Sequence, residues 1–264
     1  MLRQHNALVI RICLNMKPHP TGTPPRTGPP AASQGHLAGA TGLIGRALCA
    51  QWLAEPAAQD RPTLHLWVRR PLPAGHPAGQ ATGGQQTPVQ VHCVDFAALP
   101  ALPPAGPGDC AISALGTTLA VAGSPAAFRA VDFDAVLAFA SAARRAGIRR
   151  FAAVSALGAD ARSRTFYNRV KGEAEDALQA LGFETLVIAR PSLLAGDRAS
   201  LQQAPRRGEQ FALALTRPLA RWLPRGLRPI EADTVARALT HALGTCGPGV
   251  HVLDNAELQR RGQA

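Results

Sequence analysis

The chain has 264 residues, which suits one large α/β domain. Of these residues 46% are hydrophobic, which is enough for an apolar core and excludes a wholly disordered chain. No apolar run reaches the roughly 18 residues needed to span a bilayer, which argues against an integral membrane protein. The five cysteines are scattered and never spaced C-x-x-C, which argues against a disulfide framework or a zinc site. It also indicates a reducing compartment, so we expect a cytoplasmic protein.

The net charge of +11 comes with 28 basic residues, of which only Lys17 and Lys171 are lysines. Abundant Ala, Pro, Gly and Arg with scarce Lys and Tyr is typical of GC-rich coding, so the basic excess is partly compositional. Because lysine and tyrosine are rare, Lys171 and the single tyrosine, Tyr167, are positions of interest.

Residues 1–33 are expected to be a disordered or spurious N-terminal extension. Prolines are frequent between positions 18 and 30, which favours an extended or disordered chain. The apolar piece at 7–14 is short and interrupted by Arg11, so a secretory signal is not expected. The segment contains no acidic residue, which leaves a transit peptide open.

Beyond residue 34, strand-like and helix-like segments alternate. A weak strand over 36–38 leads into a glycine turn. Further strands are expected over 63–68, 89–96, 110–116, 151–158, 183–192 and 249–255. Helices are expected over 44–54, 127–147, 167–181, 208–224 and 234–243. This alternation predicts an α/β fold, a Rossmann-like doubly wound parallel sheet covered on both faces.

The predicted domain covers 34–255 and includes a small substrate lobe at about 193–245. The pattern loosens after residue 192, which is why a lobe and not a second domain is expected there. Residues 256–264 are expected to form a C-terminal tail.

The glycine turn at 39–45 has the spacing G-x-x-G-x-x-G and opens a helix. Glycines let the backbone turn tightly and approach a pyrophosphate, and the helix N-terminus offers N–H groups and partial positive charge. An ordinary strand-to-helix turn is the alternative.

Arg69 and Arg70 follow the strand expected at 63–68. A protein that binds NAD usually has Asp or Glu there to hold the ribose hydroxyl, whereas arginines can pair with the 2′-phosphate of NADP. We therefore favour NADP over NAD. Asp95, near the end of the next strand, could accept a hydrogen bond from the adenine amine, and a turn or cap role is the alternative.

Tyr167 stands four residues before Lys171, so on a helix the two share a face. A phenol alone is a poor acid–base group at neutral pH, and a neighbouring ammonium favours its phenolate form. Ser155, at the end of an expected strand, could hydrogen-bond the same substrate oxygen. The three side chains predict a proton relay beside a hydride donor, and an exposed helix pair is the alternative.

Four motifs together resemble the atypical branch of the short-chain dehydrogenase/reductase superfamily. They are GATGLIG (39–45), VSALGA (154–159), YNRVK (167–171) and RPSLLAG (190–196). The chain is most similar to the Tat-interacting-protein-like oxidoreductases and the NAD-dependent epimerase/dehydratase-like proteins, over about 36–255.

The resemblance implies a Rossmann-like fold and a nicotinamide cofactor. The residues that would line the pyrophosphate are Gly39, Thr41, Gly42, Leu43, Ile44 and Gly45. The remaining cofactor residues would be Arg69 and Arg70 at the 2′-phosphate, Asp95 at the adenine, Leu115 and Gly116 at the ribose, and Pro191 beside the nicotinamide.

The resemblance also implies catalytic roles. Ser155 would polarise the substrate carbonyl, Tyr167 would be the acid–base, and Lys171 would bind the nicotinamide ribose and favour the phenolate. Two features depart from the family pattern. The first strand is weak, and the 127–147 helix lacks the asparagine with which many relatives hold a relay water. The sequence therefore does not assign the group that connects the proton relay to solvent. A weak or vestigial enzyme is an alternative.

We therefore expect an NADP- or NAD-dependent oxidoreductase for a small carbonyl or alcohol, acting as a monomer or homodimer without nucleic acid or metal. A nucleotide-sugar epimerase or dehydratase would use the same three side chains, although its substrate usually needs a larger lobe. A non-catalytic NADPH-binding redox sensor or interaction protein would need only the cofactor site. The arginine-rich stretch 198–228 could attract nucleic-acid or membrane phosphates, but a solvated basic face is the interpretation we prefer.

Overall fold

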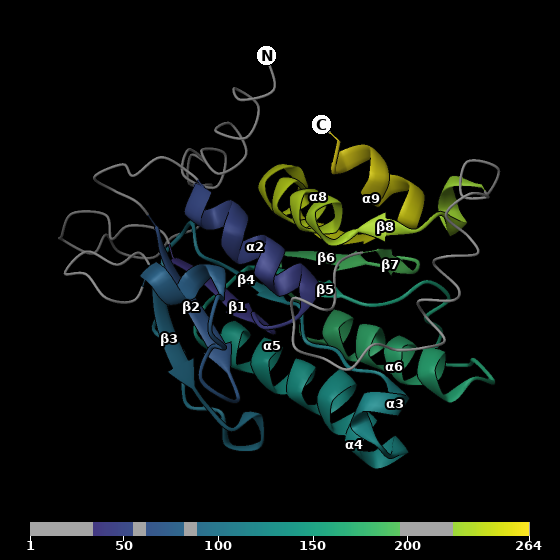
Figure 1. Ribbon diagram of the computed structural model, residues 1–264, viewed down its shortest axis with the longest axis horizontal. Coiled ribbons are helices and arrows are strands. Elements are labelled where there is room, and N and C mark those ends of the chain that lie inside the picture. Colours follow the sequence, from purple (N-terminus) through teal and green to yellow (C-terminus); the bar gives the residue numbers. More distant parts are fainter. Residues whose placement is uncertain (1–33, 55–61, 82–88, 196–223, 264) are drawn as a thin grey trace.

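The computed structural model describes residues 34–54, 62–81, 89–195 and 224–263. Within these ranges seven parallel strands form one sheet in the order β3-β2-β1-β4-β5-β6-β9 (Figure 1). The strands are β1 (Gln34–Ala38), β2 (Thr63–Val68), β3 (Val89–Cys93), β4 (Cys110–Ser113), β5 (Arg150–Val154), β6 (Thr185–Ala189) and β9 (Gly249–Leu253). The predicted doubly wound parallel α/β sheet is therefore confirmed.

Helices cover both faces of the sheet (Figure 1). On one face lie α2 (Leu43–Ala54), α8 (Ala232–Thr245) and α9 (Asn255–Arg261). On the other lie α5 (Val136–Arg145) and α6 (Phe166–Ala180), preceded by the short α3 (Leu119–Ala122), α4 (Pro125–Arg129) and a π-helical segment, η3 (Ala130–Ala135). None of the helices in the described ranges combines the length and hydrophobicity needed to cross a membrane.

Two apolar cores follow from the alternation of side chains along each strand. In β6, Val187 faces the core shared with α2 and α8, and its neighbour Ile188 faces the core shared with α5 and α6. All five residues of β6 are buried, as expected for a strand covered on both sides. The sheet is thus buried on both faces, and the ends of its strands can hold the connecting loops in fixed positions.

The weak first strand lies in the sheet between two neighbours, β2 and β4. Gly35 adds little strand propensity, but a Cβ there would lie 2.8 Å from the Trp52 ring of α2, so the glycine lets the helix pack close. His36 is buried and stacks on His65 at 4.8 Å between ring centroids. Tertiary packing therefore supplies the stability that this sequence lacks.

Several expected strands end earlier than the apolar pattern suggested. β3 stops at Cys93 where the strand was expected to reach 96, and β4 stops at Ser113 where it was expected to reach 116. β5 and β6 also end short of 158 and 192. Beyond these ends the chain leaves the ladder at the carboxyl edge of the sheet, with some residues buried, such as Ser155, and others exposed, such as Gly116 and Leu157.

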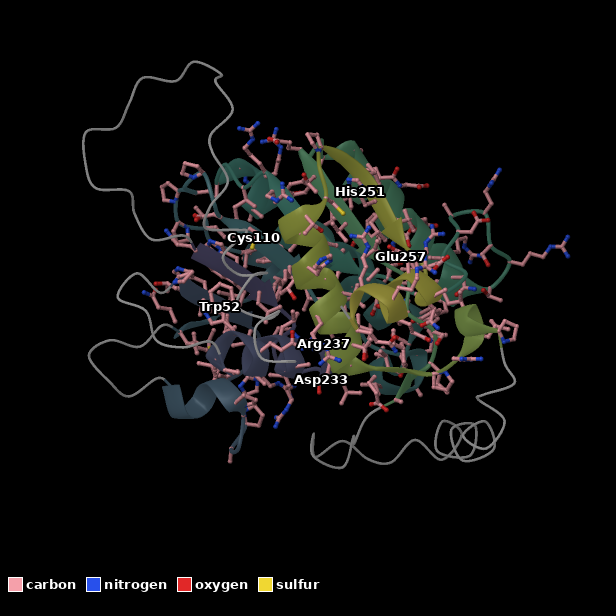
Figure 2. The ribbon with its side chains drawn as sticks, turned by 90° about the horizontal axis from the view of Figure 1, so that it is seen from above. Trp52, Cys110, Asp233, Arg237, His251 and Glu257 are labelled. Atoms are coloured by element: carbon pink, nitrogen blue, oxygen red, sulfur yellow. The ribbon has the colours of Figure 1, made fainter. Side chains whose placement is uncertain are left out.

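The C-terminal region contains a helix where only a tail was expected. Arg237 of α8 donates from Nε to the Gly262 carbonyl at 2.7 Å, which holds the end of α9 beside α8 (Figure 2). A Cβ at Gly262 would lie 2.3 Å from the Thr234 carbonyl oxygen, so the close approach needs glycine.

In the expected substrate lobe, β7 (Leu194–Ala195) pairs with β8 (Ile230–Glu231). A short 3-10 turn, η5 (Arg225–Leu227), comes just before β8 in the chain.

The N-terminal extension 1–33, the helix expected over 208–224 and most of the arginine-rich stretch lie outside the described residues.

Candidate active site

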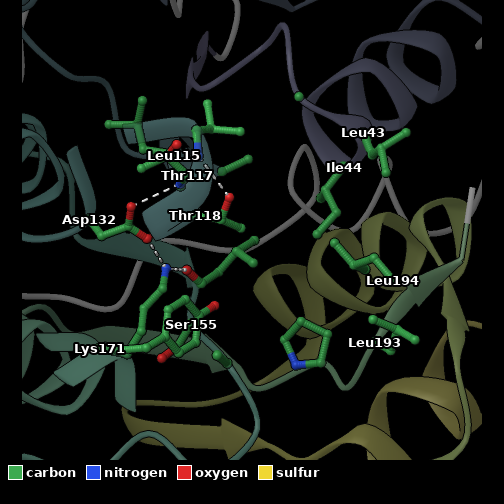
Figure 3. Close-up of a pocket in the computed structure, with 18 of the residues that line it drawn as sticks. Leu43, Ile44, Leu115, Thr117, Thr118, Asp132, Ser155, Lys171, Leu193 and Leu194 are labelled. Carbon is green, nitrogen blue, oxygen red and sulfur yellow. Dashed lines mark hydrogen bonds and ion pairs between the residues drawn. The ribbon is translucent and has the colours of Figure 1, made fainter. Parts of the chain in front are cut away.

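A pocket of about 300 Å³ opens at the carboxyl ends of the central strands (Figure 3). The chain runs from β1 outward to β3 and then returns to β4 on the other side of β1, and a crevice is expected at such a reversal. Its lining comes from the loops after β1, β4, β5 and β6, from the end of β5 and the start of β7, and from α2, α3, η3 and α6. The lining residues are Gly42, Leu43, Ile44, Ala114, Leu115, Gly116, Thr117, Thr118, Val121, Asp132, Val154, Ser155, Ala156, Tyr167, Lys171, Pro191, Ser192, Leu193 and Leu194.

The glycine turn connects β1 to α2 by a route that larger residues could not follow. Gly39 has φ +86°, and a Cβ there would lie 2.4 Å from the Ala114 carbonyl carbon. A Cβ at Gly45 would lie 2.1 Å from the Gly39 oxygen. A Cβ at Gly42 would meet only that oxygen, at 3.6 Å, so its pocket side is open to a ligand. The turn therefore presents the N-terminus of α2 to the pocket.

Helix α6 carries the predicted acid–base pair to the same pocket. Gly172 lets the helix sit against the loop after β5, because a Cβ there would lie 2.1 Å from the Ala161 amide nitrogen. Tyr167 is half-buried and packs on Phe128 with 5.4 Å between ring centroids. Tyr167 and Lys171 share the pocket-facing side of the helix, as their spacing predicts.

The ammonium of Lys171 is buried in an ion pair. Its Nζ lies 2.8 Å from Oδ1 of Asp132 and donates to the Val154 carbonyl at 3.5 Å (Figure 3). Burial alone would lower the pKa of Lys171, but attraction by Asp132, and then by Tyr167 and Glu175, outweighs it, so this pKa lies above the ordinary lysine value. Lys171 is therefore a cation under a loop that lines the pocket.

The hydroxyl of Ser155 is also tied to a buried carboxylate. Its Oγ donates to Oε1 of Glu175, which is 3% exposed. Arg190, at the end of β6, donates from Nε to both carboxylate oxygens at 3.0 and 3.2 Å. The hydrogen bonds that Arg190 donates to Glu175 raise the pKa of Arg190, and the pair holds Ser155 from behind.

The loop after β6 is fixed by an asparagine from α9. The Ser192 amide donates to Oδ1 of Asn255 at 3.0 Å, and Nδ2 of Asn255 donates to the Arg228 carbonyl at 2.8 Å. Pro191 lies in this loop and lines the pocket. A fully buried polar side chain thus sets the position of the wall opposite α6.

Nine of the predicted residues line the pocket together: Gly42, Leu43, Ile44, Leu115, Gly116, Ser155, Tyr167, Lys171 and Pro191. Gly39 and Gly45 shape the turn behind it, and Thr41 is exposed at the tip of the turn.

Three other predicted residues do not line this pocket. Arg69 and Arg70 are exposed directly after β2. Asp95 accepts from the Ala97 amide at 2.9 Å and caps the short 3-10 turn η2 (Phe96–Ala98), which is the structural role considered for it. Contact of these residues with a cofactor stays a prediction.

Three charged residues of this region, Asp132, Glu175 and Arg190, were not expected to take part in the site. Glu175 follows Lys171 by four residues, so helical spacing could have placed it on the catalytic face. Asp132 could not be found in this way, because its partner comes from a different helix.

No protein-family model matches the chain. Solved structures show the same fold at low sequence identity. One is a UDP-N-acetylglucosamine 4-epimerase from Methanobrevibacter ruminantium in complex with UDP-N-acetylmuramic acid, with a TM-score of 0.57, 14% identity and coverage of 84% of this chain and 76% of that one. Another is a UDP-glucuronic acid 4-epimerase from Bacillus cereus in complex with NAD, with a TM-score of 0.56, 15% identity and coverage of 83% and 77%. The resemblance to epimerase/dehydratase-like members of the short-chain dehydrogenase/reductase superfamily is confirmed in fold.

Curated relatives are considerably more similar in sequence. The protein fmp52 of Emericella nidulans is 38% identical over 68% of this chain and 74% of its own length. The FMP52 protein of Eremothecium gossypii is 32% identical over 84% and 94%. Both are named as mitochondrial proteins, so the expectation of a cytoplasmic protein, which rested on cysteine usage alone, is wrong. The extent of these matches shows that the chain belongs to the FMP52 protein family.

Proposed function

We propose that the chain is an oxidoreductase that uses NADP in preference to NAD and interconverts a small carbonyl compound and its alcohol. One observation carries the proposal. Ser155, Tyr167 and Lys171 line one pocket at the point where the glycine turn opens α2. A hydrogen-bonding group, a phenol and an ammonium in one cleft are the set that proton transfer to or from a substrate oxygen requires.

The described residues fit a dinucleotide. Gly42 leaves its pocket side open, and Leu43 and Ile44 place the first turn of α2 beside it, where backbone N–H groups suit a pyrophosphate. Leu115 and Gly116 would border the nicotinamide ribose, and Pro191 the nicotinamide. When bound, the nicotinamide supplies the hydride donor or acceptor.

Each catalytic side chain has a separate task in this proposal. Tyr167 holds the proton that moves to or from the substrate oxygen. The Lys171 ammonium stabilises the phenolate form by its charge and offers hydrogen bonds to the ribose. Ser155 orients the substrate oxygen at the other side of the pocket. Burial of Lys171 and Ser155 excludes water around these polar atoms and so strengthens their interactions.

The preference for NADP rests on Arg69 and Arg70, two exposed guanidinium groups after β2 that suit a 2′-phosphate. The double variant Arg69→Ala/Arg70→Ala should weaken NADPH binding by about tenfold or more and leave NADH binding unchanged. Arg144→Ala/Arg145→Ala removes an exposed pair at the end of α5 and serves as the matched control. Equal loss for NADPH and NADH would remove the basis for NADP preference.

The first experiment is a fluorescence titration with NADPH and NADH, followed by a panel of small aldehydes and ketones monitored at the NADPH absorbance. The proposal expects tighter binding of NADPH and consumption of NADPH with at least one carbonyl class. Absence of binding to both cofactors would refute it.

A second function is favoured by the fold comparison, because solved neighbours include nucleotide-sugar epimerases. An epimerase would retain tightly bound NAD through purification and would interconvert UDP-sugars without net change in NADH absorbance. Finding both properties would replace the reductase proposal.

A further inference from the structure

A buried carboxylate, Asp132, lies in the helical segment that joins α4 to α5. Asp132 lies in η3, where the helix widens to a π-helical segment between α4 and α5. Such segments insert an extra residue and often occur at functional sites. Asp132 is buried here, whereas Asp134, two residues later, is exposed. The segment therefore directs one of two nearby carboxylates into the pocket.

Both oxygens of Asp132 have partners that belong to the site. Oδ1 lies 2.8 Å from Nζ of Lys171, and Oδ2 accepts from the Thr117 amide at 2.8 Å (Figure 3). The exposed fractions of the Lys171 and Asp132 side chains are 6% and 0%. A Cβ on Gly116 would lie 3.5 Å from Oδ1 and 3.7 Å from Nζ, so the loop after β4 covers the pair. One carboxylate thus ties the lysine to that loop.

The other charges facing Lys171 do not replace this carboxylate. On its own helix, Tyr167 and Glu175 approach it, but Glu175 is already paired with Arg190, the residue that follows β6. The Val154 carbonyl of β5 contributes a dipole at 3.5 Å, not a charge. A buried ammonium without a counter-ion tends to lose its proton, because desolvation disfavours the charged form.

We propose that Asp132 is a positioning residue that keeps Lys171 protonated and holds its ammonium beneath the loop after β4. The role deepens the proposed function, because a neutral or displaced Lys171 could neither stabilise the phenolate nor hold the ribose. Asp132 acts through Lys171 and has no step of its own.

The test uses the rarity of lysine. In the full chain with Lys17→Arg, Lys171 is the only lysine, and a ¹³C label on its Cε reports its protonation by NMR across a pH titration. The proposal expects Lys171 to stay protonated to higher pH than a free lysine side chain. Asp132→Asn should move the transition to lower pH, and Asp134→Asn should leave it unchanged. Asp132→Asn should also lower the affinity for NADPH, whereas Asp134→Asn should preserve it.

The proposal would be overturned if Lys171 in the Lys17→Arg chain lost its proton at or below the pH at which a free lysine side chain does. It would also be overturned if Asp132→Asn left the pH of this transition unchanged. If Asp132→Asn does not fold, Asp132→Glu decides, because it keeps the charge and should keep the raised transition. The titration needs neither cofactor nor substrate. A normal lysine transition therefore refutes the positioning role, whereas a raised transition without any NADPH binding refutes the proposed function instead.

Discussion

At the scale of single residues, two buried carboxylates, each paired with a cation, contact residues that line the pocket. Asp132 pairs with Lys171, and Glu175 pairs with Arg190 while accepting the hydroxyl of Ser155. Buried pairs contribute little net stability compared with apolar residues, but removal of one partner leaves a charge without compensation. The two pairs therefore hold the Lys171 ammonium and the Ser155 hydroxyl in place as long as both members of each pair are present.

Glu175→Gln tests the second pair. The change removes the negative charge that Arg190 and Ser155 share, so the free energy of unfolding should fall by about 2 kcal/mol, less than for a fully buried pair because the Arg190 side chain is 33% exposed. Urea unfolding measures the difference.

Glu173→Gln is the matched control on the same helix. Glu173 pairs with Arg129 at the surface, with side chains 32% and 41% exposed, so its loss should change stability by less than about 1 kcal/mol. If both variants lowered the free energy of unfolding equally, the buried pair would contribute no more to stability than the surface pair.

At the scale of elements, the β1–α2 turn depends on one backbone conformation. Gly39→Ala places a Cβ 2.4 Å from the Ala114 carbonyl carbon at a positive φ, so the turn must move away from the loop after β4. We expect loss of NADPH binding and a lower unfolding midpoint. Gly75→Ala has a similar φ of +72° but meets nothing within 4 Å, so it should cost about 1–2 kcal/mol of strain and keep NADPH binding. Intact binding in Gly39→Ala would contradict the proposed cofactor site.

The first three strands carry a stack of imidazoles, of which His36 and His65 are buried, and this burial makes stability pH-dependent. Burial, and then neighbouring histidines, lower the pKa of His36 to about 3, and burial, and then His92, lower that of His65 to about 4. In the unfolded chain these groups bind protons near pH 6.5, so the unfolded state binds more protons below that value. Their contribution to stability is therefore complete above about pH 6.5 and is lost progressively as the pH falls toward the folded values.

Urea unfolding at pH 7 and pH 5 measures this loss, expected at about 2 kcal/mol for each of the two histidines. His65→Phe keeps a ring in the stack without a titrating group and should reduce the difference between the two pH values. His251→Phe, on β9 and outside the stack, should leave the difference as it is. An unchanged pH dependence in His65→Phe would argue against the stack as its source.

The elements that the sequence predicted are those with long local patterns. The helices α2 and α6 and the strand β2 were expected within a few residues of their observed bounds, and so was the end of α5, although the helix expected from 127 begins as α4 and η3 and becomes α5 only at Val136. The segment 119–135 was not resolved into α3, α4 and η3, because such short turns depend on caps such as Thr118 and Ser124 and on contacts with α6. β1 has a weak strand pattern in the sequence. It is stabilised by packing on Trp52 and by pairing with β2 and β4, and these contacts cannot be read from its own residues.

At the scale of the whole molecule, the parallel sheet brings together residues from far apart in the chain. Tyr167 and Lys171 were predicted from spacing, and the structure places both at the pocket with the glycine turn and Ser155. Asp132 and Arg190 were missed because pairing across elements is decided by the three-dimensional fold. The parts of a site that lie on one helix or one turn are thus visible in the sequence, and the charges that support them are not.

In the proposed mechanism, the phenol of Tyr167 transfers the proton while the cofactor is held elsewhere in the pocket. Because Tyr167 is the only tyrosine, Tyr167→Phe removes the only phenol of the chain. The decisive measurement is NADPH consumption with an active carbonyl substrate, compared between the unmodified chain and Tyr167→Phe, with NADPH affinity measured for both. We predict a loss of turnover of about 100-fold or more with unchanged NADPH affinity. Turnover by Tyr167→Phe at the rate of the unmodified chain would contradict the mechanism.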